Sequence, residues 1–370
     1  MTTPTFTTDY NNILQQVDNI NPSKYEKTRN YITGAVTKLS PYISRGVIST
    51  HQILEALVAK GYKLYQMEKL VQELAWRDYY QQVWITKQDA INSDLRQEQP
   101  GVKNYDIPTA VVEATTGISA IDDAITEYYK TGYLHNHIRM YIASIVCNIG
   151  RSHWLTPARW MYYHLLDADW ASNALSWQWT AAAFSTKKYY ANQDNVNKFC
   201  NTYDDNTFLS VSYDDFEKLG IPPLLRPTQA FNEVTTLPIP TAITINPNEP
   251  TFVYNFYNLS PTWCTVPTAN KVLLLEPSFF KTYPVSDNTI TFILNLANTI
   301  PNMQVFVGEF AALKTSCGTS GIYYKEHPTN RHYKGLVTPR ECLVPSVTGY
   351  YPSFFGYWKN VEKQLKKIYA

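Results

Sequence analysis

Cysteines are few, and their spacing excludes several kinds of site. The 370 residues include Cys147, Cys200, Cys264, Cys317 and Cys342, and no two of these form a C-x-x-C pair. Neither a zinc site nor an iron–sulfur cluster is indicated, so no metal ion is expected. An odd, dispersed set of cysteines is typical of a protein kept in a reducing compartment.

Long apolar runs are absent as well. No uncharged apolar stretch is long enough to cross a membrane. The opening sequence, MTTPTFTTDY, lacks the basic segment and apolar run of a signal peptide. We therefore expect a cytoplasmic protein that has no membrane partner and is a monomer.

An excess of one charge is also missing. The net charge is +1 and charged residues make up 17% of the chain, so a nucleic-acid surface would have to be a local basic patch. No G-x-G-x-x-G fingerprint occurs, which argues against an ordinary FAD oxidoreductase. Aromatic residues, in contrast, are abundant, with 29 tyrosines and nine tryptophans. Aromatic packing and large planar ligands both explain such a composition.

The hydrophobic pattern divides the chain into two parts. Residues 1–205 show helical spacing, as in 71–84, 119–130, 134–149 and 157–166, and Gly132 is expected to end the second of these helices. Residues 206–250 are rich in proline, threonine and asparagine, which indicates a linker or irregular region. Residues 251–370 predict a smaller α/β domain ending in a helix, with strands at 251–257, 271–275 and 304–307 and a helix at 286–299. The expected fold class is α+β.

Four segments of the helical part carry polar and aromatic residues that could bind a ligand or take part in a reaction. The first, T-K-L-S-P-Y (37–42), places hydroxyls and a lysine before a predicted helix, where phosphate could bind. The second, E-L-A-W-R-D-Y-Y (73–80), puts Glu73, Trp76 and Arg77 on one helix face. Taken singly, these two are better explained by a helix cap and an exposed ion pair.

The other two segments are more suggestive. L-H-N-H-I-R-M (134–140) places Asn136 and Met140 one turn apart on an otherwise apolar helix. Residues 167–179, which end in S-W-Q-W, hold two acids, an asparagine and three tryptophans, and packing alone hardly explains them.

Together, in this order and spacing, the four segments resemble the FAD-binding half of the photolyase/cryptochrome family. The likeness covers roughly residues 25–197 and is nearest to a short branch resembling photolyases of cyclobutane pyrimidine dimers (CPDs) that lacks the N-terminal antenna domain. It implies a mostly helical FAD-binding domain over residues 1–205. The α/β segment that follows would be an antenna-like domain moved to the C-terminus or an unrelated partner module. An antenna chromophore is neither indicated nor excluded.

The resemblance implies a set of FAD contacts. Arg139 would pair with Asp167 beside the flavin ring, where two buried charges need each other. Asp169 would line the flavin, and Asn173 would face flavin N5, where a neutral amide suits a fully reduced, anionic flavin better than a carboxylate. The phosphates and ribitol would be held by a further set, Tyr25, Val36, Thr37, Lys38, Leu39 and Ser40. Arg77 would be another cofactor contact.

The resemblance also implies an activity, that of a deoxyribodipyrimidine photo-lyase, in which excited reduced FAD passes an electron to a pyrimidine dimer in DNA and splits it. Glu73, Asn136 and Met140 would meet the lesion. Glu73 would act as a protonated acid, with its pKa raised by burial among indoles. Relatives acting on the (6-4) lesion carry histidines at the positions of Asn136 and Met140, so the CPD is the expected substrate.

Other residues would hold the DNA or conduct electrons. Trp76 and Trp179 would stack on the extruded bases. His137 stands where the family commonly has arginine, which weakens one phosphate contact. Trp177 and Trp154 match the first two members of the family's tryptophan chain; the third has no counterpart, and Tyr105 falls in roughly its region. The remaining candidate phosphate contacts are Arg151, Lys187 and Lys188, for which solvated surface charge is the simpler explanation.

One alternative function stays open. A blue-light receptor of the cryptochrome kind would use the same flavin photochemistry to drive an interaction with a partner protein. The aromatic run at 350–355 could serve as its docking surface. The presence of Glu73, Asn136 and Met140 favours repair.

Overall fold

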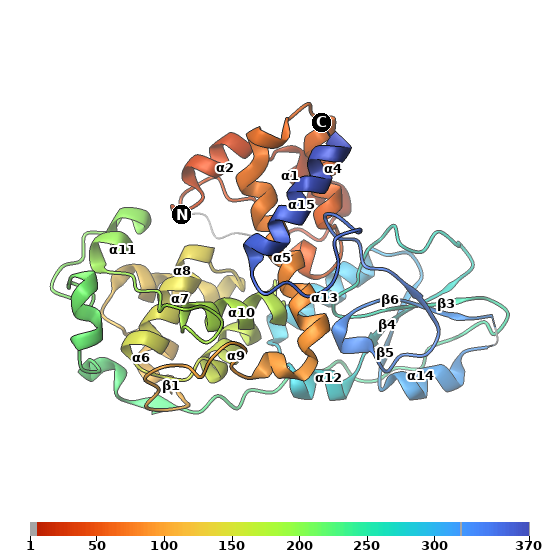
Figure 1. The fold of residues 1–370 in the computed structure, drawn as a ribbon. Helices are drawn as coiled ribbons and strands as arrows, with labels where there is room; N and C mark the ends of the chain where they lie inside the picture. Colours follow the sequence, from red (N-terminus) through yellow and green to blue (C-terminus); the bar gives the residue numbers. More distant parts are fainter. Residues whose placement is uncertain (1–5, 319, 370) are drawn as a thin grey trace. The chain divides into compact units, whose positions relative to one another are not determined.

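The computed structural model describes residues 6–318 and 320–369, and it confirms the α+β class, with many helices and one parallel sheet (Figure 1). The first five residues of the opening segment lie outside this range. The chain divides into two compact units. The helical unit consists of Ser23–Val36 and Lys87–Glu233, and the mixed unit of Phe6–Pro22, Thr37–Thr86 and Val234–Ala370. These units cut across the boundaries at 205 and 250 that the sequence pattern suggests.

The helical unit is built around α10 (Trp170–Thr180), which packs against α8 (Asn136–Ala143) and α9 (Leu155–His164). Trp154, Trp160, Trp170 and Trp177 are all buried in it. The strands β1 (Ile107–Pro108) and β2 (Thr228–Gln229) form a small antiparallel pair. The other elements of the helical unit are α2 (Pro22–Thr28), η1 (Gln88–Asn92), α6 (Thr109–Val112), α7 (Ser119–Thr131), η2 (Ser144–Ile149), α11 (Gln193–Cys200), η3 (Tyr213–Lys218) and η4 (Pro223–Leu225).

Helix α7 forms where the sequence predicts it. Its apolar stripe, Ile121, Ile125 and Tyr128, is fully buried. Gly132 ends the helix in the left-handed region at φ 66°. A Cβ at this position would also lie 2.6 Å from Leu166 Cγ, so only glycine fits.

The helix expected over 134–149 changes its winding part-way. Helix α8 ends at Ala143, and Ser144–Ile149 continues as a fully buried π-helical segment, η2. The Gly150 N–H donates to the Ile145 carbonyl at 2.7 Å, a five-residue spacing. π-Helical turns of this kind occur frequently at functional sites.

The mixed unit contains a five-stranded sheet in which all neighbours are parallel. Its strands are β3 (Thr251–Tyr254), β4 (Asn270–Leu275), β5 (Met303–Val307), β6 (Ile322–Lys325) and β7 (Leu336–Thr338), in the spatial order β5-β4-β3-β6-β7. The sequence pattern predicts the first three strands and misses β6 and β7. The order reverses between β3 and β6, the kind of position where ligands bind in open α/β sheets.

Helices of the mixed unit come from both ends of the sequence. They are α1 (Tyr10–Asp18), α3 (Ser40–Ser44), α4 (Thr50–Ala59), α5 (Leu64–Lys87), α12 (Pro277–Thr282), α13 (Asp287–Asn298), α14 (Phe310–Ser316) and α15 (Phe354–Tyr369), with the short turn η5 (Pro328–Asn330). Figure 1 shows the blue α15 beside the orange α4 and α5. The Phe354 ring stacks on Trp76 of α5 at 3.7 Å, and the Tyr369 hydroxyl bonds to Glu55 of α4.

This packing explains why residues 37–86 group with the C-terminal part. The apolar face of α15 is buried, with Tyr357, Val361 and Leu365 at most 2% exposed. Each such side chain contributes about 1.5–3 kcal/mol when it is removed from water.

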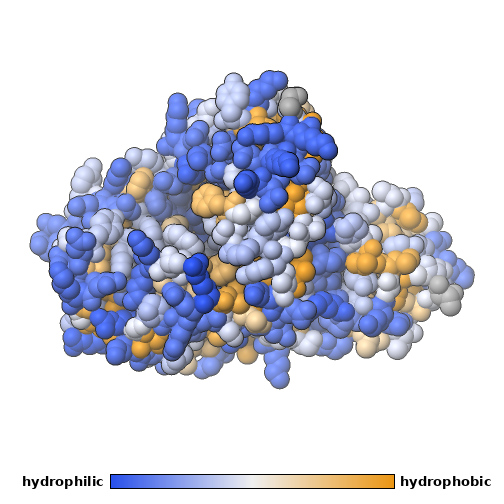
Figure 2. Space-filling model, in the orientation of Figure 1, coloured by the Kyte–Doolittle hydropathy of each residue, from blue (hydrophilic) through white to orange (hydrophobic). Residues whose placement is uncertain are grey.

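The face of the molecule in Figure 2 is mostly hydrophilic, with apolar patches scattered over it. No helix within 6–318 and 320–369 is long and apolar enough to span a membrane.

Asp78 of α5 gives this packing a measurable pH dependence. Its Oδ2 accepts hydrogen bonds from Thr50 Oγ1 at 3.0 Å and from the Leu343 N–H at 2.6 Å. Burial raises the pKa of Asp78 from 3.8 to about 6, although both bonds oppose the rise. Folding therefore takes up a proton between about pH 4 and 6, and the free energy of unfolding falls as the pH rises through this window.

We expect Asp78→Asn to remove the pH dependence of stability that Asp78 causes, since an amide oxygen can accept both bonds without carrying charge. The difference in the free energy of unfolding, wild type minus variant, should be roughly 2–3 kcal/mol larger at pH 4 than at pH 7. Urea titrations at the two pH values measure it. Asp287→Asn, at an exposed aspartate of α13, is the control, and equal pH dependence of wild type and Asp78→Asn would contradict the expectation.

Candidate functional site

The centre of the candidate site in the helical unit is an ion pair between α8 and the turn before α10. Arg139 Nη2 donates to both oxygens of the Asp167 carboxylate, at 3.1 and 3.0 Å, and Arg139 Nε donates to the Leu134 carbonyl. Asp167 is 6% exposed. Burial alone would lower the pKa of Arg139, but the attraction of Asp167 outweighs it and raises this pKa. The two side chains thus pair as the sequence predicts.

Two further predicted flavin residues lie on the same stretch of chain. Asp169, 2% exposed, precedes α10, and its Oδ2 accepts a hydrogen bond from Ser172 Oγ at 2.6 Å. Asn173 donates through Nδ2 to the Ala158 carbonyl of α9 at 2.7 Å. This bond fixes the amide, so Oδ1 is the atom with which Asn173 can accept a bond from a ligand.

The predicted phosphate-binding residues are divided between the units. Tyr25 lies on α2, and the Val36 N–H donates to the Gly34 carbonyl, both in the helical unit. Thr37 to Ser40 belong to the mixed unit, where Thr37 Oγ1 accepts from the Leu39 N–H at 3.4 Å.

Backbone and side-chain geometry single out two of the cations predicted to bind phosphate. Lys38 has a φ of 53°, in the left-handed region that residues other than glycine rarely adopt. Strained backbone of this kind tends to occur at ligand sites. Arg77 donates to the Ser44 hydroxyl and so joins α5 to the end of α3.

The residues predicted to meet the lesion are in different surroundings from those expected. Glu73 is exposed, so the burial that was expected to raise its pKa is missing. It lies on the outward side of α5, while Leu74 and Ala75 next to it face the core. Asn136 and Met140 do share one face of α8, with Asn136 Nδ2 3.9 Å from Met140 Sδ.

The two tryptophans predicted to sandwich a base differ. Phe354 lies parallel to Trp76, with 8° between the rings, and covers one face of its indole. A base could stack only on the other face. Trp179 is 37% exposed and its ring is tilted by 37° against Tyr189. The sequence pattern suggested Phe354 as part of a docking surface at 350–355, but its ring is 3% exposed because it packs on Trp76. That contact was missed, because no local pattern connects residue 354 to α5.

The predicted polar DNA contacts are of unequal strength. His137 Nδ1 is 2.7 Å from the Asn30 carbonyl, and burial lowers the pKa of His137, so it is a neutral imidazole near pH 7. It cannot replace the positive charge of an arginine. Lys187 is exposed. Lys188 is half-buried, and burial lowers its pKa.

Both tryptophans predicted to carry electrons are buried in the helical unit. Trp177 is 2% exposed on α10, and Trp154 is fully buried at the start of α9. The indole N–H of Trp154 donates to Asp94 Oδ1 at 2.6 Å. Asp94 was not predicted from the sequence, since its partner is far away along the chain.

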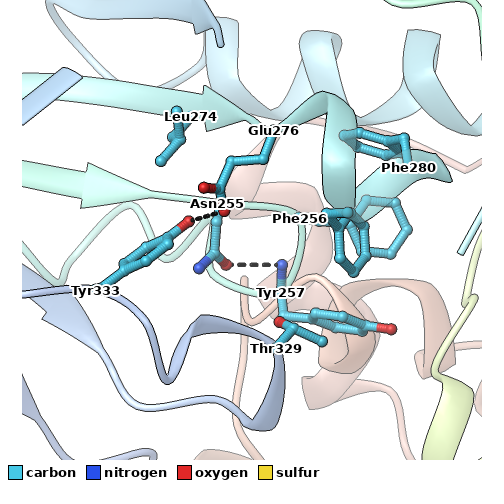
Figure 3. A pocket seen from close by; sticks show the side chains of 9 residues that line it. Asn255, Phe256, Tyr257, Leu274, Glu276, Phe280, Thr329 and Tyr333 are labelled. Carbon is cyan, nitrogen blue, oxygen red and sulfur yellow. Dashed lines mark hydrogen bonds between the residues drawn. The ribbon is translucent and has the colours of Figure 1, made fainter. Parts of the chain in front are cut away.

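A small open pocket of about 20 Å³, room for little more than one water molecule, lies in the mixed unit at the carboxyl ends of the strands (Figure 3). The buried Glu276 follows β4 and accepts from the Tyr333 hydroxyl at 2.9 Å and from the Phe310 N–H at 2.9 Å. His332 Nε2 lies 2.9 Å from the same carboxylate. These groups satisfy one another, and Phe256, Phe279 and Phe280 make up the apolar wall. No cluster of residues that could hold a metal ion occurs in the described part of the chain.

Comparison with known proteins shows what residues 70–210 are similar to. Residues 70–210 match the family described as the FAD binding domain of DNA photolyase. This part of the chain is similar to the photolyase/cryptochrome family. It is 30% identical over 165 residues to a deoxyribodipyrimidine photo-lyase of Alkalihalophilus pseudofirmus, covering 43% of this chain and 34% of that protein.

Two other relatives include one protein named a photo-lyase and one named a cryptochrome. A deoxyribodipyrimidine photo-lyase of Streptomyces griseus is 32% identical over 159 residues, covering 42% of this chain and 34% of that protein. A cryptochrome DASH of Danio rerio is 29% identical over 170 residues, covering 42% and 32%. The chain thus spans about a third of the length of the curated relatives it matches.

The residues present fit an FAD cofactor. The Asn173 amide oxygen, fixed by the bond to Ala158, is a buried acceptor of the kind that a flavin ring nitrogen needs. In the same unit, Arg139 neutralises the charge of the buried Asp167 carboxylate.

We expect Asp167→Ala to lose most of its flavin. Removing one partner of a buried ion pair leaves the Arg139 charge uncompensated, at a cost of about 3–5 kcal/mol. The FAD absorbance per protein after desalting measures the loss. Asp215→Ala, which removes the surface pair with Lys218, is the matched control and should keep its flavin. Full occupancy in Asp167→Ala would mean that this pair does not support the cofactor.

Proposed function

We propose that this chain binds DNA containing cyclobutane pyrimidine dimers and splits them with light absorbed by FAD. The observation that carries the proposal is the match of residues 70–210 to the FAD binding domain of DNA photolyase. Relatives named deoxyribodipyrimidine photo-lyase over the same region support it. When bound, FAD supplies the electron that enters the dimer.

The chain's own residues would bind and orient the DNA and the cofactor. An enzyme that acts on a base in duplex DNA must first take it out of the stack, and aromatic faces compensate for the lost stacking. The exposed Trp179 and the partly exposed Trp76 are the indoles available for this. The exposed Lys187, eight residues after Trp179, would contact a phosphate. Arg139, Asp167 and Asn173 would hold the cofactor during the reaction.

The choice of lesion follows from the side chains on α8. An amide and a thioether, Asn136 and Met140, cannot release a proton at neutral pH. His135 is buried at 7% exposure, and His137 is neutral and lies against the Asn30 carbonyl. Splitting a cyclobutane ring requires hydrogen bonding more than net proton transfer, so this surface suits the CPD better than the (6-4) lesion.

A blue-light receptor is the second candidate, and one observation favours it. Phe354 covers a face of Trp76 that a photolyase would offer to a base. The cryptochrome DASH relative also shows that the match extends beyond proteins named photo-lyase. In that case the excited flavin would act on a partner protein.

A repair assay distinguishes the two candidates. The reduced protein is illuminated with defined oligonucleotides that carry either one CPD or one (6-4) lesion, and lesion loss is followed by chromatography. We expect loss of the CPD only. Comparable repair of the (6-4) substrate would contradict the lesion assignment, and repair of neither would favour the receptor.

Glu73→Ala tests the predicted acid at its exposed position. An exposed carboxylate only accepts hydrogen bonds, so Glu73 can donate to the dimer only when the bound DNA covers it and keeps it protonated. In that case its loss should lower repair per absorbed photon about tenfold, the effect of one charge-stabilising hydrogen bond. FAD content should be unchanged. Glu68→Ala removes an exposed glutamate of the same helix and should repair normally. Equal yields in both variants would exclude Glu73 from the reaction.

A further inference from the structure

We propose that Tyr105 is the terminal electron donor of this protein and that Asp94 stabilises the positive charge that passes through Trp154. The inference rests on the proposed function, in that light-excited flavin is the oxidant. It concerns residues of the helical unit alone. Its basis is a column of rings that leads from a buried indole to the protein surface.

The inner end of the column is the Trp154 indole. It is fully buried, and its N–H donates to Asp94 Oδ1 at 2.6 Å, a short bond of the charge-assisted kind. Oxidation of an indole creates a cation whose N–H becomes strongly acidic. A carboxylate at the N–H stabilises that cation by Coulomb attraction, and it can take the proton.

Two other buried indoles of the same unit donate to neutral partners. The Trp160 N–H donates to the Tyr129 hydroxyl at 3.1 Å. The Trp170 N–H donates to the amide oxygen of Asn92 at 3.0 Å. A positive charge is therefore better stabilised on Trp154 than on either of these.

Asp94 is held so that it faces Trp154. Its Oδ2 accepts from the Gln99 N–H at 2.7 Å, and its Oδ1 lies 3.2 Å from His153 Nε2. The other nitrogen of this ring, Nδ1, accepts from the Leu155 N–H at 3.3 Å. His153 therefore carries its proton on Nε2, toward Asp94.

The outer part of the column is His153 and Tyr105. The His153 ring lies 5.7 Å from that of Trp154, and the Tyr105 ring stacks on His153 at 5.3 Å with 30° between the planes. Tyr105 is 70% exposed. The column thus connects the buried indole to solvent through ring contacts.

The electrons and protons balance along this path. Trp154 would give up one electron, through the tryptophan chain, to the light-excited flavin, and would be left with one positive charge. Tyr105 then gives one electron to Trp154 and loses its phenolic proton to water, so Trp154 is neutral again and Tyr105 is a neutral tyrosyl radical. A thiol or ascorbate in solution returns one hydrogen atom to Tyr105.

The experiment follows radicals in the flavin-loaded protein after a light flash. In the wild type a tryptophan radical should form and be replaced by a tyrosyl radical, seen by transient absorption and electron paramagnetic resonance. Tyr105→Phe should form the tryptophan radical and lack the tyrosyl signal, and Tyr105→Trp should restore a long-lived radical. Asp94→Asn should lower the yield of long-lived radical about tenfold, because a neutral hydrogen bond replaces a charged one.

A second readout locates the radical chemically. Illumination with a nitroso spin trap, followed by peptide mass spectrometry, should place the adduct on Tyr105. Tyr203→Phe is the matched control, because Tyr203 is 95% exposed in the same unit, and it should behave like the wild type.

The outcomes separate this inference from the proposed function. A tyrosyl radical that persists in Tyr105→Phe, or adducts on Tyr203 in place of Tyr105, would overturn the role of Tyr105. An unchanged yield in Asp94→Asn would overturn the role of Asp94. The absence of any tryptophan radical in the wild type would overturn both the inference and the flavin photochemistry on which it rests.

Discussion

A carboxylate removed from water needs hydrogen-bond donors, and three buried acids of this chain have donors from segments distant in the sequence. Asp167 holds α8 through Arg139, and Asp78 holds α5 to the backbone at Leu343. Glu276 gathers three donors at the ends of the strands. Since an unpaired buried charge costs several kcal/mol, these contacts leave little freedom for the elements they join.

Elements with strong local patterns were predictable. The stripe of isoleucines and the glycine stop define α7, and the apolar runs define β4 and β5 with α13 between them. β6 and β7 were missed because they are short and because Tyr323, Tyr324 and the exposed Leu336 show no clear alternation. The interleaving of the two units has no local signal at all, because it depends on side chains that meet across most of the sequence.

In the candidate site too, contacts between residues far apart in the sequence could not be predicted from local patterns. The pairing of Arg139 with Asp167 was anticipated, because the resemblance to the family supplied a partner that spacing alone could not. The surroundings of Glu73 and Trp76 were not anticipated, since both depend on how α5 is covered. Asp94 escaped notice for a related reason: a single aspartate in a loop carries no pattern, and only the fold brings it to an indole N–H.

The interleaved units also constrain how the protein can be made. Residues 37–86 leave the ribosome early, but the helix that covers Trp76 and Tyr79 is the last one of this sequence to be synthesised. At typical translation rates, those aromatic faces wait for tens of seconds without their cover. During this interval the nascent chain exposes an aggregation-prone aromatic surface that a holdase chaperone would cover. The distance along the sequence between α5 and α15 therefore makes folding in the cell a matter of timing as well as of stability.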